Sequence, residues 1–340
     1  MINWTQVATL VMGAMLSAHV FYGGIDMALA DPVATSREAA AAMPKTSAAA
    51  PATSGLDKTA AIFAQAAAPV APPAAEQPAK EPRGRAYLFR GALGPIFSRG
   101  MDRLTERIER AGITASVYEF TICPLVAQKA IREYRQAPAP IILIGHSMGG
   151  LCGLKFAEML QAEGVPVSLL VTIDAIHGSP NVPPNVERYF NIFLSDSVLG
   201  GGDVMPPQGY QGHYASFDLS RQEDVTHINI DKMDLVHEQL VTKILQLAVT
   251  PAKAEGEAVP LRYVVPPNTA IELWDSGMPV VARPGDTLQT LAVLHHVPLW
   301  SLTQMNQESE SAPLIPGQRV VIPRHLVPLA TASRRSPTRR

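Results

Sequence analysis

Between residues 83 and 248 the apolar positions follow two alternating patterns. In the first, short runs are apolar at most positions, which indicates strands of a sheet buried on both faces. These runs are 85–90, 115–120, 141–144 and 167–173. In the second, apolar residues recur every three or four positions, as on one face of a helix. These stretches are 101–111, 125–134, 151–160 and 235–247. The alternation predicts an α/β fold, with a mostly parallel sheet flanked by helices.

The stretch 176–220 has no clean periodicity and is rich in proline and glycine. So long a segment without regular structure inside a domain is usually a lid or a binding loop. We therefore expect a lid or a binding loop here, with room for one short helix within 188–199.

A smaller unit follows, between residues 278 and 324. The pattern predicts a strand at 280–283, a helix from 288, a second helix from 298 to 306 and a final strand to 323. Asp286 is the expected N-cap of the first helix. This β-α-α-β unit is too small to bury much apolar surface. The preceding stretch, 261–275, could add a strand either to this unit or to the larger domain.

The remaining segments differ in composition from both domains. Residues 1–30 combine an apolar run with Ala28-Leu29-Ala30, which fits a cleavage site, so we predict a signal peptide. An uncleaved membrane anchor is the alternative. Residues 31–82 and 249–260 read as Ala/Pro-rich linkers, the first of them disordered, and 325–340 as a basic tail.

Composition narrows the possible functions. The net charge of −2 gives no overall field that would favour nucleic acid, and we expect no nucleic-acid partner. The two cysteines, Cys123 and Cys152, do not have the spacing of a metal site. A disulfide is possible in an oxidising compartment, but we expect two buried thiols.

The chemistry centres on Gly145-His146-Ser147-Met148-Gly149, a G-x-S-x-G motif between the predicted strand 141–144 and the predicted helix from 151. On such a turn the serine takes a strained backbone, and the glycines remove side chains that would collide with the neighbouring strand and helix. Ser147 is therefore the predicted nucleophile.

A serine hydroxyl needs a histidine base, and the base needs a carboxylate that fixes its tautomer. Where a G-x-S-x-G turn joins a strand to a helix in a catalytic domain, the three residues follow one another along the chain as serine, acid and histidine. Asp174 follows the strand 167–173, and His227 precedes the helix 235–247. We predict Asp174 and His227 as the partners of Ser147. If the acid comes from a later strand end, Asp203 or Asp218 replaces Asp174.

Three other histidines are alternatives to His227 as the base: His177, His213 and His237. His237 is expected inside a helix. His146 lies within the motif, and we expect it to pack or hydrogen-bond beside the nucleophile.

An oxyanion hole needs two N–H donors. Met148 N–H is the first, and the second is expected from Gly91 or Ala92, after the first strand. Arg90 could meet an anionic substrate group or form a structural ion pair.

The string Ile-Gly-His-Ser-Met-Gly-Gly resembles the nucleophile elbow of the α/β-hydrolase superfamily, lipases and thioesterases included. The resemblance covers 83–248, and the acid position is similar to that of the thioesterase-type branch. It implies hydrolysis of an ester or thioester through an acyl-enzyme, without a cofactor. Export favours esters of lipids or of envelope polymers, including acyl groups on a glycan.

Pro-Gly-Asp-Thr-Leu at 284–288, Asn306 and Ile-Pro-Gly-Gln-Arg-Val-Val-Ile-Pro at 315–323 resemble a LysM domain. With the preceding strand we assign it residues 261–324. The resemblance implies binding of N-acetylglucosamine glycans, such as peptidoglycan. The residues that it places in the glycan groove are Gly285, Asp286, Thr287, Leu314, Ile315, Pro316 and Gly317.

The sequence therefore predicts an exported serine hydrolase of the periplasm or cell envelope, held to peptidoglycan by a LysM module. Membrane contact is expected only through an uncleaved anchor. The alternative is a non-catalytic envelope protein that binds glycan and uses the hydrolase fold as a scaffold.

Overall fold

The computed structural model describes residues 83–249 and 256–327, all within the unit Lys80–Arg340. The predicted signal peptide, the N-terminal linker and most of the basic tail lie outside these ranges. In the described ranges no helix combines the length and apolar character needed to cross a membrane.

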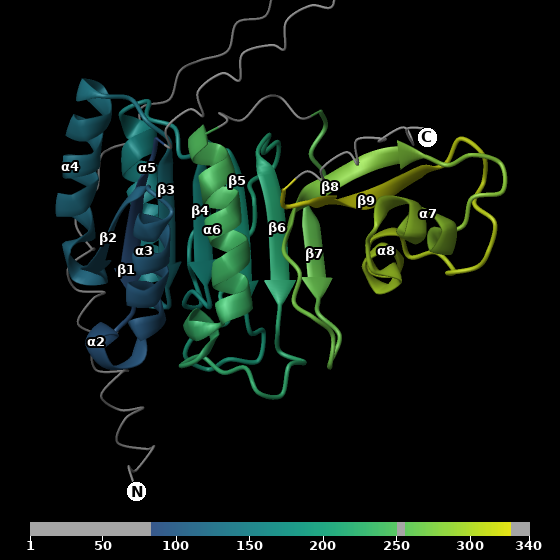
Figure 1. Ribbon diagram of the computed structural model, residues 1–340, viewed down its shortest axis with the longest axis horizontal. Coiled ribbons are helices and arrows are strands. Elements are labelled where there is room, and N and C mark those ends of the chain that lie inside the picture. Colours follow the sequence, from purple (N-terminus) through teal and green to yellow (C-terminus); the bar gives the residue numbers. More distant parts are fainter. Residues whose placement is uncertain (1–82, 250–255, 328–340) are drawn as a thin grey trace, which may run out of the picture. The chain divides into compact units, whose positions relative to one another are not determined.

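Seven parallel strands form one sheet in the order β2-β1-β3-β4-β5-β6-β7 (Figure 1). They are β1 (Arg85–Arg90), β2 (Thr114–Glu119), β3 (Ile141–His146), β4 (Leu169–Ile173), β5 (Arg188–Phe193), β6 (His213–Asp218) and β7 (Leu261–Val264). The predicted parallel α/β sheet is confirmed.

Helices cover both faces of the sheet (Figure 1). They are α2 (Gly94–Phe97), α3 (Arg99–Arg110), α4 (Cys123–Gln136), α5 (Met148–Ala162) and α6 (Asp234–Val249). Along β1, Ala86 and Leu88 pack in the cluster that contains the buried residues of α3 and α6, whereas Tyr87 and Phe89 pack with α4 and α5. Successive side chains of a strand point to opposite faces, so an apolar run serves two cores at once.

The prediction that residues 176–220 form a lid or binding loop without regular structure is wrong, as is the helix within 188–199. This stretch supplies β5 and β6, in which every residue is buried. The pattern was hidden because polar residues lie within these strands. Asn191, for example, is buried, and its amide donates to the Gly202 carbonyl at 3.1 Å while its oxygen accepts from the Thr172 hydroxyl at 2.9 Å.

The segment after residue 256 contributes to both parts of the fold. β7 pairs with β6 and so belongs to the seven-stranded sheet. The chain then forms β8 (Trp274–Val281), α7 (Leu288–His295), α8 (Leu299–Asn306) and β9 (Arg319–His325), and β8 pairs antiparallel with β9. This is the predicted β-α-α-β unit. Its first helix is capped by Thr287 in a capping box with Thr290, and the expected cap Asp286 instead accepts the Arg283 N–H at 2.8 Å.

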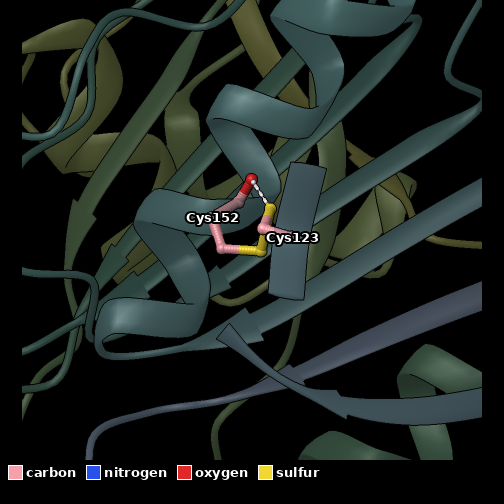
Figure 2. The surroundings of a disulfide bond; sticks show 2 residues. All are labelled: Cys123 and Cys152. Carbon is pink, nitrogen blue, oxygen red and sulfur yellow. Dashed lines mark hydrogen bonds between the residues drawn. A yellow bond between two sulfur atoms is a disulfide. The ribbon is translucent and has the colours of Figure 1, made fainter. Parts of the chain in front are cut away.

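A disulfide joins Cys123, the first residue of α4, to Cys152 in α5 (Figure 2). The Cα atoms are 5.9 Å apart, and Cys123 Sγ lies 3.1 Å from the Cys152 carbonyl oxygen. The expectation of two buried thiols is therefore wrong. The sequence cannot reveal that the start of α4 lies beside the second turn of α5.

Candidate active site

Ser147 lies between β3 and α5, on a backbone that non-glycine residues rarely adopt. Its φ and ψ are 56° and −123°. A Cβ at position 145 would lie 2.0 Å from the Gly149 carbonyl oxygen, and one at position 149 would lie 2.2 Å from that of Phe89. Only glycine fits at these two positions, which is the packing that the motif predicts.

Three side chains converge at the carboxyl edge of the sheet. His227 Nε2 is 3.1 Å from Ser147 Oγ, and His227 Nδ1 is 2.7 Å from Asp174 Oδ2. Asp174 follows β4, and His227 lies in the connection between β6 and α6. The structure thus brings together the three residues that the sequence singled out, although they are widely spaced along the chain.

Asp174 is fully buried and has a positive φ of 43°. Its Oδ1 accepts the N–H groups of Leu194 and Gly201, at 3.1 and 2.8 Å. Burial favours the neutral carboxyl, but the hydrogen bonds from His227 and the two N–H groups outweigh it and lower the pKa of Asp174. Asp174 is therefore a fixed carboxylate with both oxygens occupied.

The alternative acids and bases have other partners. Asp203 pairs with exposed Arg262, and Asp218 accepts the N–H groups of Ser195 and Ser220. The three histidines also bond elsewhere: His177 with the Ser197 carbonyl, His213 with Asp275, and His237 with the Asp231 carbonyl.

His146 is buried beside the site and hydrogen-bonds on both sides of its ring. Nδ1 is 2.8 Å from Ser98 Oγ, and Nε2 is 2.9 Å from the His227 carbonyl oxygen. Burial and the neighbouring His227 lower the pKa of His146 to about 3, so the ring is neutral. Sequence reasoning did not find Ser98, because nothing in its local pattern separates it from a serine at a helix start.

The two alternatives for the second oxyanion donor differ in the structure. Gly91 presses against the nucleophile, since a Cβ there would lie 2.8 Å from that of Ser147. Its N–H, however, donates to Ser98 Oγ at 3.1 Å. Ala92 N–H makes no hydrogen bond within the described part of the chain. Met148 is the first residue of α5, so its N–H has no partner in the preceding turn.

Arg90 forms a structural ion pair. Its Nε is 3.0 Å from Asp102 Oδ2, and its Nη1 is 2.8 Å from Glu119 Oε1. The hydrogen bond with Asp102 raises the pKa of the guanidinium despite its partial burial. Two carboxylates thus occupy Arg90, so it does not offer an uncommitted charge to a substrate.

Exposed aliphatic and exposed polar side chains both lie at this edge of the sheet. Five exposed aliphatic side chains lie on the segments that follow β1, β2 and β5. They are Leu93, Ile96, Ile122, Leu125 and Val198. Because these strands are parallel, their carboxyl ends meet at the edge that holds Ser147.

In the C-terminal unit, the two predicted glycan-binding segments lie side by side. The Leu314 N–H donates to the Asp286 carbonyl at 2.8 Å, and Gly317 N–H donates to Ala282 at 2.9 Å. Gly285 and Gly317 have φ of 88° and 90°, which favours glycine. Ile315 between them is exposed.

Residues 280–323 match the family model of the LysM domain. One similar solved structure is a hydrolase of the α/β superfamily from Xanthomonas campestris pv. campestris, at 16% identity and a TM-score of 0.30, covering 48% of this chain and 98% of that one.

Two structures of the NocB thioesterase domain also match, each with a TM-score of 0.26, and each match covers 55% of this chain. One is a covalent complex with a fluorophosphonate nocardicin G analogue; its sequence identity is 17%, and 85% of that chain is covered. The other is the domain from the nocardicin cluster; its sequence identity is 16%, and 84% of that chain is covered. No curated protein matches the chain.

The strand order, the G-x-S-x-G turn between β3 and α5 and the match at 280–323 define the class of protein: a parallel α/β sheet of the hydrolase type followed by a LysM domain.

Proposed function

We propose that the protein is an exported serine hydrolase that cleaves ester or thioester bonds and is held to the cell wall by its LysM domain. The observation that carries the proposal is the hydrogen-bonded series Ser147–His227–Asp174, with distances of 3.1 and 2.7 Å. The serine lies on an elbow, the acid is buried, and the base contacts both.

In the proposed reaction Ser147 Oγ attacks the carbonyl carbon of the substrate, and His227 Nε2 takes the hydroxyl proton. Asp174 holds Nδ1–H and stabilises the imidazolium. Met148 N–H and Ala92 N–H stabilise the tetrahedral oxyanion, and Ala92 is preferred to Gly91 because the Gly91 N–H is already engaged. His227 then protonates the leaving group. Water, activated by His227, hydrolyses the acyl-enzyme and restores Ser147.

Exposed aliphatic side chains at this edge of the sheet favour a substrate with an apolar acyl group. Ile96, Leu125 and Val198 are 66%, 71% and 89% exposed, and they lie on the segments that follow β1, β2 and β5. An acyl chain lying across these side chains would remove that surface from water. This chemistry fits lipid esters, and it also fits acyl groups attached to an envelope polymer.

LysM domains are typical of proteins that bind N-acetylglucosamine glycans at the cell envelope, and the match at 280–323 supports that location here. The disulfide between Cys123 and Cys152 supports an oxidising compartment.

The test is labelling of the purified full chain with a fluorophosphonate probe. We expect labelling of wild type and none of Ser147→Ala or His227→Ala. Matched controls are Ser301→Ala, a buried serine of α8, and His295→Ala, in α7; both should label as wild type does. Absence of labelling in folded wild type contradicts the proposed hydrolase and favours a glycan-binding scaffold. Glycan binding is measured separately, by co-sedimentation with peptidoglycan.

A further inference from the structure

A single series of hydrogen bonds connects the loop after β1 to the backbone of His227. It runs from the Gly91 N–H to Ser98 Oγ at 3.1 Å, from Ser98 Oγ to His146 Nδ1 at 2.8 Å, and from His146 Nε2 to the His227 carbonyl oxygen at 2.9 Å. Ser98 and His146 are each 1% exposed, so water does not compete for these bonds.

The two ends of the series fix the direction of every bond in it. A carbonyl oxygen can only accept, so His146 Nε2 carries the proton and donates to His227. The neutral ring then has an unprotonated Nδ1, which accepts from the Ser98 hydroxyl. Ser98 Oγ in turn accepts the Gly91 N–H. One tautomer of His146 and one rotamer of the Ser98 hydroxyl satisfy all three contacts.

The series ends at both halves of the proposed catalytic machinery. Gly91 contacts Ser147 and precedes Ala92, the proposed oxyanion donor. His227 is the proposed base, and its ring lies 4.9 Å from that of His146, centroid to centroid. No strand or helix links these two loops directly, because one follows β1 and the other follows β6.

We propose that Ser98 and His146 are positioning residues, which hold the oxyanion loop and the catalytic base at a fixed distance from each other across Ser147. The inference rests on the proposed function and assigns two residues to it that the serine, histidine and aspartate series does not include. Neither residue touches the reacting atoms.

The hydrogen-bond series from Gly91 through Ser98 and His146 to His227, called the relay below, has two consequences for the reaction. It withdraws Gly91 N–H from the oxyanion hole, which leaves the N–H of Ala92 to face the oxyanion. It also keeps an uncharged ring against His227 when that residue takes the serine proton. A protonated His146 would oppose this second charge at close range.

The experiment compares variants that break the relay with one that rebuilds it. His146→Phe keeps a planar ring but makes neither hydrogen bond, and Ser98→Ala removes the central hydroxyl. His146→Gln carries an acceptor oxygen and a donor N–H on one carbon, as His146 does with Nδ1 and Nε2–H on Cε1. We measure kcat and KM on a short-chain p-nitrophenyl ester, together with the second-order rate of fluorophosphonate labelling.

We expect His146→Phe and Ser98→Ala to lower kcat and the labelling rate by ~10–100-fold, with KM within about threefold, since small misplacements of reacting groups cost that much. His146→Gln should recover most of the loss. The double variant Ser98→Ala/His146→Phe should be no slower than the worse single variant, because both break one relay.

The matched control for folding is His237→Phe. His237 is also fully buried, and its Nε2 likewise donates to a backbone carbonyl, that of Asp231, at 2.7 Å. This variant should lose thermal stability to a similar degree and keep wild-type kcat. The pH at half-maximal rate should not move in His146→Phe, whereas a shift would indicate that His146 carries the proton.

Failure of the inference and failure of the proposed function are distinguishable. If wild type labels and His146→Phe labels at the same rate, the relay has no positioning role and the hydrolase stands. If kcat and the labelling rate fall equally in His146→Phe and His146→Gln, the positioning role of the relay is likewise wrong. If folded wild type neither labels nor turns over ester, the hydrolase itself is wrong.

Discussion

Arg188, the first residue of β5, hydrogen-bonds Asp275 in β8 through Nε, at 3.1 and 3.3 Å from the two carboxylate oxygens. Asp275 is fully buried, and it also contacts His213 at 2.6 Å and Lys243 at 3.3 Å. Burial opposes its ionisation, but the hydrogen bond from His213 and the charges of Lys243 and Arg188 outweigh it and hold the pKa of Asp275 at about 2. One carboxylate therefore joins β5, β6 and α6 to the strand that enters the LysM domain.

Asp275→Asn should lower the free energy of unfolding by ~3–5 kcal/mol, because it withdraws the carboxylate from two buried cations. The measurement is urea denaturation followed by far-UV circular dichroism and by tryptophan fluorescence. Two of the three tryptophans, Trp274 and Trp300, lie in β8 and α8, so a change of fluorescence on unfolding reports mainly on the C-terminal unit. In wild type we expect the two signals to change together.

The control for this variant is Asp203→Asn, which removes a pair with exposed Arg262. Exposed ion pairs contribute ~0–1 kcal/mol, so this change should be small. If Asp275→Asn lowers the free energy of unfolding by no more than Asp203→Asn does, the buried contacts of Asp275 do not join the seven-stranded sheet to the LysM domain.

Asp174→Asn should reduce kcat by a factor on the order of 10³–10⁴, because an asparagine does not enforce the His227 tautomer that leaves Nε2 free to accept a proton. KM for a small ester should change little. Asp218→Asn is the comparison, since Asp218 is the last residue of β6 but accepts only backbone N–H groups in the described structure. Comparable losses in both variants would argue that Asp174 acts through folding alone.

Asp231 should make the protein more stable in mild acid than at neutral pH through its own titration. Burial raises the pKa of this carboxyl to about 6, above its unfolded value of 3.8. Its stabilising contribution is therefore complete below pH 3.8 and is lost as the pH rises through 6. Asp231→Asn should be more stable than wild type at pH 7.5 by ~1–3 kcal/mol, with the difference vanishing near pH 4.

The measurement is urea denaturation of both proteins at several pH values. Asp231 Oδ2 also accepts the Gly100 N–H at 2.9 Å, a bond that the asparagine oxygen can keep. A stability difference that is the same at pH 4 and pH 7.5 would assign the effect to packing and not to ionisation.

Removal of the disulfide should destabilise the protein without abolishing the site. The bond closes a sequence separation of 29 residues, and loss of such a bond costs ~2–5 kcal/mol. Cys123→Ala/Cys152→Ala should therefore melt several degrees lower than oxidised wild type. Dithiothreitol should lower the melting temperature of wild type and leave the double variant unchanged, because the chain has two cysteines in total. Equal melting of reduced and oxidised wild type would contradict this.

The parts of the fold that the sequence predicts are those with local signals. The elbow is visible because Gly145 and Gly149 meet backbone atoms within the same turn and the adjacent strand, so the constraint appears as spacing. β1, β3 and β4 are visible as short runs that are apolar at most positions. The roles of Asp174 and His227 stay predictions until activity is measured.

The parts that were missed depend on partners distant in the chain. β5 begins with a buried arginine whose partner, Asp275, comes from β8, and this arginine and Asn191 interrupt its apolar pattern. Ser98 and His146 meet only once β3 is paired with β1. The cysteine pair depends on how α4 lies against α5. In each case a buried side chain is bonded to a residue that is distant in the chain, and a single sequence does not display that pairing.

The origin of β7 bears on how this protein can be cut and recombined. β6 is buried throughout, and its outer neighbour β7 comes from residues 261–264, after the predicted second linker. A fragment that ends at residue 249 would present the hydrogen-bonding groups of β6 to other chains, which invites edge-to-edge aggregation. The seven-stranded sheet and the LysM domain therefore do not separate at the linker. Any gene fusion, truncation or evolutionary shuffling that keeps the sheet complete has to carry the strand beyond it.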